Sequence, residues 1–169
     1  AKLKNRKREM RIQIYDKFLK PDECNSLINF YKNREEHSNE CAAEWYGTWP
    51  LSITDSCKDV HEKLNGQARD INNSVTDYVQ IVRWPVGSSQ PSHHDIAHEH
   101  TTLTSIVYLN EDFGGGETYF TDGLVIEPRI GRAVFFDGQF YEHGVNTIRL
   151  LSGPFGNERY TISAWYKNE

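Results

Sequence analysis

The sequence predicts a mainly β chain with N-terminal helices, of the α+β class, and three observations indicate this. Apolar residues recur at helical spacing between residues 21 and 36, and again between residues 56 and 72. From Asp77 onward the period changes to two, and turn sequences separate short apolar segments. Many short strands joined by frequent turns are typical of a β-sandwich or barrel.

The length and the charge of the chain restrict its class. With 169 residues it is expected to form a single domain over residues 1–169. Its 19 basic and 24 acidic residues give a formal net charge of −5, which disfavours a nucleic-acid-binding protein. No apolar segment is long enough to span a bilayer, so no membrane partner is expected.

The N-terminal residues and the cysteines indicate the compartment. Residues 1–11 are basic and lack the apolar segment of a secretory signal, so a solvated basic tail is expected. The three cysteines, Cys24, Cys41 and Cys57, cannot all pair with one another, and free thiols are expected. Both observations favour a cytoplasmic protein.

The region from residue 12 to residue 76 is expected to be a mainly helical support for the strands that follow. Alternation over residues 11–18 suggests one short strand before the helices. Pro21, followed by two acidic residues, is a typical helix start. Between the two predicted helices, Trp45 and Trp49 lie in a loop, where they could cover a substrate or pack over the edge of the core.

The region from residue 77 to residue 167 is expected to form the β core. Eight strands are predicted there, at residues 78–84, 92–96, 102–109, 117–120, 124–126, 132–136, 143–147 and 159–166. Turns that contain glycine or proline separate most of them. The segment from Ile148 to Gly156 is expected to bulge out as a loop.

A His-x-Asp sequence in the second of these strands is the main chemical feature. On a strand, residues i and i+2 point to the same face, so His93 and Asp95 could bind one metal ion. His143, far along the chain, could supply a third ligand. Two histidines and one carboxylate suit non-haem Fe(II), because three positions stay open for a chelating cosubstrate and O2. A rival pair, His98 and His100, has no carboxylate at the same spacing.

Segments on both sides of this motif strengthen the interpretation. They are Arg83-Trp84-Pro85-Val86-Gly87, Thr104 to Asn110, Gly115-Gly116-Glu117-Thr118-Tyr119-Phe120, Gly131 to Phe136, Glu142-His143-Gly144-Val145 and Arg159 to Tyr166. In this order and at these spacings, over about residues 12–166, the chain resembles the prolyl 4-hydroxylase family of Fe(II)/2-oxoglutarate-dependent dioxygenases. The resemblance implies a double-stranded β-helix, the jelly-roll or cupin-like core, in residues 77–167.

The resemblance also implies roles for individual residues. The iron ligands would be His93, Asp95 and His143. Arg159 would pair with the distal carboxylate of 2-oxoglutarate, and its planar fork of donors, which stays charged when buried, agrees with that role. Tyr108 would offer its hydroxyl to the same carboxylate. Thr161 and Ser163 alternate onto the same face as Arg159 and could add hydrogen bonds to the cosubstrate.

The implied reaction is hydroxylation of prolyl residues in a proline-containing peptide or protein. It would use Fe(II), 2-oxoglutarate and O2, release succinate and CO2, and need ascorbate as a reductant. Substrate contacts are expected from Trp45, Trp49, Trp84 and Gln90. Gln90 stands where many members of the family have a tyrosine, so the substrate stays open. The alternatives are a free amino acid or other small molecule as substrate, and a jelly-roll binding module without turnover.

Overall fold

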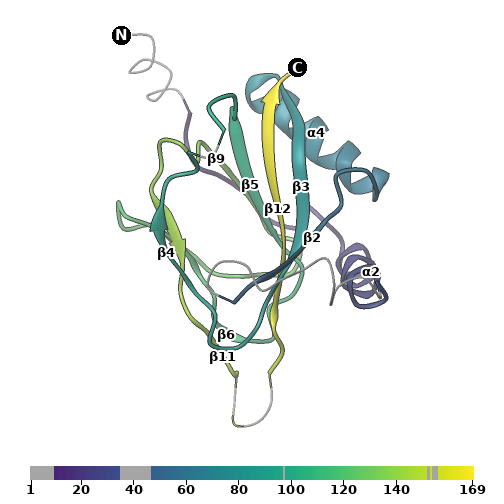
Figure 1. Cartoon of the computed structure of the whole chain (residues 1–169), viewed down its shortest axis with the longest axis vertical. Helices are drawn as coiled ribbons and strands as arrows, with labels where there is room; N and C mark the ends of the chain where they lie inside the picture. Colours follow the sequence, from purple (N-terminus) through teal and green to yellow (C-terminus); the bar gives the residue numbers. More distant parts are fainter. Residues whose placement is uncertain (1–9, 35–46, 97, 152, 154–155) are drawn as a thin grey trace.

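The computed structural model describes residues 10–34, 47–96, 98–151, 153 and 156–169. Two antiparallel sheets face each other, and two helices cover the outer face of the larger sheet (Figure 1). The fold is therefore mainly β with helices in the N-terminal half, as predicted. The predictions made for residues 1–9, Cys41 and Trp45 lie outside the described residues.

The larger sheet has the strand order β1-β9-β5-β12-β3-β2, and every neighbouring pair is antiparallel. Its strands are β1 (Gln13–Tyr15), β2 (Trp49–Ser52), β3 (Ser74–Trp84), β5 (Leu103–Tyr108), β9 (Ala133–Phe136) and β12 (Arg159–Asn168). The long strands β3 and β12 pair along most of their length.

The smaller sheet has the strand order β4-β10-β7-β8 and is also antiparallel. Its strands are β4 (Gln90–His93), β7 (Thr118–Phe120), β8 (Val125–Ile126) and β10 (His143–Val145). A two-stranded ladder of β6 (Gly114–Gly115) and β11 (Ile148–Arg149) lies at the lower end of the molecule in Figure 1. The space between the two main sheets is where the candidate site lies.

Helix α2 (Pro21–Lys32) begins at the predicted proline. The Glu23 carboxylate accepts a hydrogen bond from the Lys20 backbone N–H at 3.0 Å, which satisfies a donor at the start of the helix. The buried residues of this helix are Cys24, Leu27 and Tyr31. The helix ends earlier than predicted, with Asn33 as its cap, because the apolar stripe stops at Tyr31.

Helix α4 (Lys58–Asn72) carries the second predicted stripe. Val60, Leu64 and Ala68 are buried as expected, whereas Ile71 at the end of the stripe is only partly buried. The helix stops at Asn73, whose φ of 58° lies in the left-handed region that often ends helices. Both helices therefore rest on the larger sheet by the apolar faces that the sequence predicted.

Alternation along β12 divides the molecule into two cores. The residues that face the helices are Tyr160, Ile162, Ala164 and Tyr166, and they pack with the buried side chains of α2 and α4. The residues that face the smaller sheet are Arg159, Thr161, Ser163 and Trp165. Those paired with them on β5 include Tyr108, Ile106 and Thr104. The face that carries Arg159 is thus turned toward the inside of the jelly roll.

The sequence predicts no strand at β2, β6 or β11, and in this it is wrong. β2 lies in the segment predicted to be an aromatic loop and pairs with β3 at the edge of the sheet. Ile148 and Arg149 pair with β6 rather than bulging out in a loop. Segments this short do not show a period, and Pro50 in β2 argued against a strand. β3 also begins at Ser74, before the predicted start of the β core at residue 77.

Cys24 and Cys57 are free thiols, as expected. Burial raises the pKa of Cys24 to about 11, so its thiol stays protonated at neutral pH.

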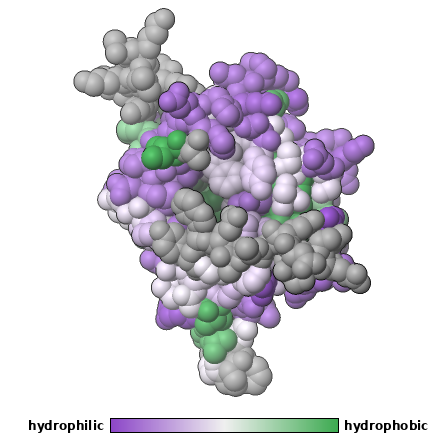
Figure 2. Space-filling view, viewed as in Figure 1, coloured by the Kyte–Doolittle hydropathy of each residue, from purple (hydrophilic) through white to green (hydrophobic). Residues whose placement is uncertain are grey.

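Figure 2 shows a face that is mainly hydrophilic, with small and separate hydrophobic areas. Within the part of the chain that the structure describes, no helix is long and apolar enough to cross a membrane.

Gly131 fixes the contact between the segment before α2 and the turn before β9. Its φ is +78°, and a Cβ there would overlap the backbone carbonyl of Leu19, whose own N–H donates to Gly131 O at 3.2 Å. Because the two backbones cannot separate without losing this contact, Gly131→Ala is expected to lower the free energy of unfolding by about 2–4 kcal/mol. Denaturant unfolding measures the loss.

Gly47 offers a matched control for this substitution. Its φ of +82° is close to that of Gly131, but none of the described residues lies within 4 Å of a Cβ built there. Gly47→Ala is therefore expected to cost only the backbone strain, about 1 kcal/mol. Equal losses in the two variants would show that strain alone, and not the contact with Leu19, makes Gly131 necessary.

Candidate active site

Three potential metal ligands converge between the two sheets. His93 ends β4 and His143 begins β10, and the two residues lie directly opposite each other in this antiparallel pair. The Nε2 atoms of both histidines lie 3.4 Å from Oδ1 of Asp95. All three ligand atoms lie within 4.8 Å of one another, so a single ion could contact them together. The structure thus brings together the three residues that the sequence singled out.

Asp95 reaches this position by a route other than the predicted one. β4 ends at His93, so the predicted strand over residues 92–96 extends too far and its two-residue period does not reach Asp95. The Asp95 backbone N–H instead donates to Gly138 O at 2.8 Å. The Thr104 hydroxyl donates to Oδ2 of the carboxylate, also at 2.8 Å. A loop of the smaller sheet and a strand of the larger one therefore hold this side chain from two sides.

Both histidines are oriented through their second ring nitrogen. Nδ1 of His93 lies 3.0 Å from Pro91 O, and Nδ1 of His143 lies 2.7 Å from Tyr141 O. A carbonyl oxygen only accepts hydrogen bonds, so each Nδ1 carries a proton and donates it. This arrangement leaves Nε2 of each ring available as a metal ligand, with its direction set by a backbone group two residues earlier.

The charges of the triad support metal binding. Burial alone would raise the pKa of Asp95, but its interactions with His143 and His93 and the hydrogen bond from Thr104 outweigh it and hold that pKa well below its usual range. Burial alone would lower the pKa of His93, but its interaction with the Asp95 carboxylate raises it, so a metal ion must compete with a proton for Nε2. A stable carboxylate beside two imidazoles is the donor set that a divalent transition metal prefers.

His143 is the most deeply buried of the three ligands. It is only 4% exposed, and its ring packs against Phe136 at 4.7 Å and Phe120 at 6.1 Å between ring centroids. Both phenylalanines belong to the core inside the jelly roll. The apolar wall behind the ring keeps water away from one side of the site.

The remaining histidines of this region lie apart from the triad. His94 turns away, with Nδ1 3.0 Å from Gln139 O. His98 and His100 contact each other at 5.4 Å between ring centroids, and His100 Nε2 lies 2.8 Å from Asp77. His98 and His100 therefore lie exposed in the loop between β4 and β5, away from the triad. This agrees with the sequence, in which this pair has no carboxylate at the two-residue spacing of His93 and Asp95.

Arg159 begins β12 and is buried, with 1% of its surface exposed. Its Nε donates to Gly116 O at 3.0 Å, and Nη2 lies 3.4 Å from the Thr118 hydroxyl. The guanidinium stacks between two aromatic rings, 4.7 Å from the centre of Trp84 and 5.4 Å from that of Tyr108. Burial lowers its pKa to about 10, which still leaves it charged at neutral pH.

The surroundings of Arg159 fit an anionic ligand. Among the described residues, no carboxylate forms an ion pair with this buried cation. Two buried polar atoms on the same inner face, Thr161 Oγ1 and Trp84 Nε1, have no hydrogen-bond partner in the part of the chain that the structure describes, although buried polar groups are normally paired. A small dicarboxylate with one end at Arg159 would satisfy both the charge and the free donors.

Tyr108 and Ser163 occupy the same face in different ways. Tyr108 is fully buried on β5, pairs with Thr161 of β12 in the sheet register, and shares a hydrogen bond with the Thr118 hydroxyl. Its hydroxyl therefore already has a partner, and its ring forms one wall around Arg159. Ser163 lies two residues beyond Thr161, is only partly buried, and sits farther along the strand toward the C-terminus.

The residues predicted to contact substrate lie in different places. Trp84 belongs to the surroundings of Arg159, and Gln90 begins β4, partly buried, just before the ligand His93. Trp49 lies on the other face of the larger sheet, 5.3 Å from the guanidinium of Arg83, and packs against the core under the helices. The structure does not bring Trp49 to the triad, and Trp45 lies outside the described residues.

Sequence reasoning missed three residues that support the site. Thr104 and Thr118 contact Asp95 and Arg159 through their hydroxyls, and Gly138 contacts the Asp95 backbone. Thr104 could have been found, because it alternates with Ile106 and Tyr108 onto the inner face of β5. No local pattern marks Gly138, whose proximity to Asp95 exists only in the folded chain.

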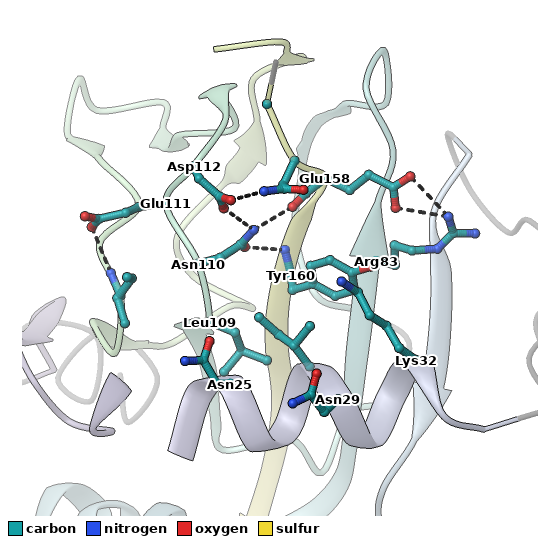
Figure 3. A pocket seen from close by; sticks show the side chains of 14 residues that line it. Asn25, Asn29, Lys32, Arg83, Leu109, Asn110, Glu111, Asp112, Glu158 and Tyr160 are labelled. Carbon is teal, nitrogen blue, oxygen red and sulfur yellow. Dashed lines mark hydrogen bonds and ion pairs between the residues drawn. The ribbon is translucent and has the colours of Figure 1, made fainter. Parts of the chain in front are cut away.

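A separate groove of about 850 Å³ lies on the opposite face of the larger sheet, between α2 and the loops before β6 and β12 (Figure 3). Its walls are polar and include Asn25, Asn29, Arg83 and Glu158, the last two paired at 3.0 Å. Tyr160 lines this groove, and since neighbouring residues of a strand point to opposite faces, Arg159 points away from it. The sheet therefore separates the groove from the triad.

The described geometry agrees with comparisons to known proteins. A family model described as 2OG-Fe(II) oxygenase superfamily matches residues 79–167, a range that includes the triad and Arg159. No curated protein matched the chain.

Similar solved structures include three prolyl hydroxylases. A viral collagen prolyl hydroxylase from Paramecium Bursaria Chlorella virus-1 has 21% identity and a TM-score of 0.70, with 94% of this chain and 96% of that chain covered. A Pseudomonas putida prolyl-4-hydroxylase has 17% identity and a TM-score of 0.74, with coverages of 98% and 96%. A Trichoplax adhaerens prolyl hydroxylase, in complex with a hypoxia inducible factor peptide fragment, has 17% identity and a TM-score of 0.66, with coverages of 99% and 92%.

These likenesses confirm the double-stranded β-helix, and the family model confirms the enzyme class. The family model matches more than half of the chain. The structure also brings together the two histidines and the aspartate that would bind the metal in this class. This chain belongs to the 2OG-Fe(II) oxygenase superfamily and is an Fe(II)- and 2-oxoglutarate-dependent oxygenase.

Proposed function

We propose that this oxygenase hydroxylates prolyl residues in a peptide or protein. The observation that carries the proposal is the placement of three potential metal ligands and of a buried Arg159, which forms no ion pair with a described carboxylate, between the same two sheets. The fold over nearly the full length is similar to those of prolyl hydroxylases, one of them bound to a peptide fragment. Because a fold does not determine a substrate, the prolyl specificity is a proposal.

Each residue of the site has a proposed task. The iron ligands would be His93, Asp95 and His143, which leave three positions of an octahedral site open. Arg159 would bind the distal carboxylate of 2-oxoglutarate, with Thr161 Oγ1 and Trp84 Nε1 as further partners at that end. When bound, the iron supplies the O2 chemistry: a C–H bond, 2-oxoglutarate and O2 give C–OH, succinate and CO2, and ascorbate keeps the metal reduced.

An aromatic pair beside the triad supports a proline-containing substrate. Tyr78 and Trp165 face the inside of the jelly roll, with ring centroids 5.8 Å apart, and Tyr78 is 43% exposed. Trp165 pairs in the sheet register with Thr104, whose hydroxyl binds Asp95. Aromatic surfaces dock proline-rich chains well, so this pair could hold the substrate chain close to the metal.

Incubation with proline-containing peptides tests the proposal. Peptides of varied sequence around one proline are incubated with the enzyme, Fe(II), ascorbate and 2-oxoglutarate and then analysed by mass spectrometry. The expected result is a gain of one oxygen on proline, located by fragmentation, with one succinate formed for each oxygen added. The gain should vanish without 2-oxoglutarate and in His93→Ala.

Other outcomes of this experiment are equally informative. Succinate formation without any oxidised peptide would contradict the prolyl proposal, and free amino acids and other small molecules would then be tried as substrates. Neither succinate nor oxidised peptide from iron-loaded protein would favour a binding module without turnover.

A further inference from the structure

We propose that Thr104 is a positioning residue that restricts Asp95 to binding the metal through one oxygen, and that Gly138 provides the space for this arrangement. The inference rests on the proposed role of Asp95 as an iron ligand. It assigns a task to two residues that lie outside the His-Asp-His cluster and that contact Asp95.

The two oxygens of the Asp95 carboxylate have different surroundings. Oδ1 faces the triad and lies 3.4 Å from Nε2 of both histidines. Oδ2 accepts the hydroxyl of Thr104 at 2.8 Å. The side chain of Asp95 is only 13% exposed, so water can hardly reach the carboxylate to compete with the Thr104 hydroxyl. One oxygen is thus presented to the metal, and the other is held by the protein.

Thr104 is well suited to hold an oxygen in place. It lies in the middle of the larger sheet, between Phe136 of β9 and Trp165 of β12, and is 3% exposed. Its branched side chain has few rotamers, so the hydroxyl is fixed by the strand. A hydroxyl has one proton to donate, and this one is given to Asp95.

Gly138 closes the other side of the carboxylate. Its carbonyl oxygen accepts the Asp95 N–H at 2.8 Å. A Cβ at this position would overlap Oδ2 of Asp95 and come within 2.6 Å of the Thr104 hydroxyl. Any residue other than glycine would therefore push the carboxylate off its hydrogen bond. The loop and the strand together define one orientation of Asp95.

The consequence concerns the number of open metal positions. An octahedral ion held by one oxygen from Asp95 and one nitrogen from each histidine would have three positions open. 2-Oxoglutarate would use two of them as a chelator, and O2 the third. If Oδ2 were released, the carboxylate could bind through both oxygens and occupy one of these positions. The hydroxyl of Thr104 would thus protect cosubstrate binding more than metal binding.

The test compares Thr104→Val, which has nearly the same shape without the hydroxyl, with Thr104→Ser, which keeps the hydroxyl. Mn(II) affinity is measured by titration, and 2-oxoglutarate affinity by calorimetry at saturating Mn(II), with thermal unfolding as a check of folding. Thr104→Val is expected to keep Mn(II) affinity within about threefold and to weaken 2-oxoglutarate binding by about 10- to 100-fold. Thr104→Ser is expected to bind both within about twofold of the wild type.

Three results would overturn the proposal. In the first, Thr104→Val binds 2-oxoglutarate as the wild type does. In the second, Thr104→Val loses Mn(II) rather than 2-oxoglutarate, which would make the hydroxyl a support of the ligand itself. In the third, Thr104→Ser fails as badly as Thr104→Val, which would indicate packing rather than a hydrogen bond. If the wild type binds neither Mn(II) nor 2-oxoglutarate, the proposed function fails first, and that outcome is distinct from these three.

Discussion

Replacing His93 by alanine is expected to abolish Fe(II) binding and turnover, whereas the same change at the neighbouring His94 is expected to leave both unchanged. The two residues are adjacent and both partly exposed, but only His93 has its Nε2 3.4 Å from Asp95 Oδ1. His94 points to Gln139 O instead. Removing a partner that only supports a metal ligand can cost up to about 100-fold, so loss of a ligand itself should exceed about 100-fold in affinity and activity.

This pair of variants is measured by metal titration and by 2-oxoglutarate-dependent succinate formation. Because neither side chain is fully buried, both variants should keep the thermal unfolding transition of the wild type. Retention of the metal by His93→Ala, or an equal loss in both variants, would contradict the assignment of His93 as a ligand.

The metal cluster and Arg159 could be predicted from the sequence because their chemistry is unusual. Two histidines and an aspartate in a strand-rich chain point to few functions, and a cation on the inner face of a closing strand points to an anion. The helices were also predictable, since their stripes, such as Val60, Leu64 and Ala68, follow a period of 3.6. The helix stripes are contained in nearby residues, whereas the cluster joins His93 and Asp95 to the distant His143.

The position of Asp95 shows where local reasoning fails. The prediction placed it by strand alternation, but β4 ends at His93, and distant groups, Gly138 O and the Thr104 hydroxyl, fix it. The result was correct although its predicted cause was not. Contacts between residues far apart in the chain leave no periodic signal, so they could be found only in the folded structure.

Trp49 illustrates the same limit on a larger scale. Its sequence surroundings, rich in aromatic residues and punctuated by glycine and proline, fitted a loop over a substrate as well as aromatic residues packed over the edge of the core, and for Trp49 the second alternative is confirmed. The segment instead pairs with β3 at the edge of the sheet. Side chains of a strand alternate between its two faces, and Trp49 lies on the face that carries Arg83 and packs under the helices. A change of one residue in register would have reversed its face.

Arg159→Met is expected to abolish the use of 2-oxoglutarate while leaving the free protein at least as stable as the wild type. The guanidinium is buried with no carboxylate partner among the described residues, and a buried unpaired charge destabilises the folded state. Methionine has a similar length and no charge. The hydrogen bond to Gly116 O is lost, but removal of an uncompensated cation is expected to offset that loss.

Thermal unfolding with and without the cosubstrate separates the two effects. At about 100 times its Kd, a ligand that binds only the folded protein stabilises it by about 2.7 kcal/mol, so Mn(II)-loaded wild type should gain about that much from 2-oxoglutarate. Arg159→Met should gain nothing, and its kcat/KM for 2-oxoglutarate should fall by more than about 100-fold, since both hydrogen bonds and charge are lost. Arg159→Lys keeps the charge without the planar fork and should lie between the two.

A Met variant that 2-oxoglutarate stabilises as strongly as the wild type would mean that the dicarboxylate binds elsewhere. A Met variant that is clearly less stable without the ligand would mean that Gly116 and the stacked rings of Trp84 and Tyr108 already compensate the cation. The expected result is a conflict between binding and stability at one residue: a charge that weakens the empty fold is retained because the cosubstrate neutralises it. Such a conflict would distinguish a site built for an anion from an arginine kept only for packing.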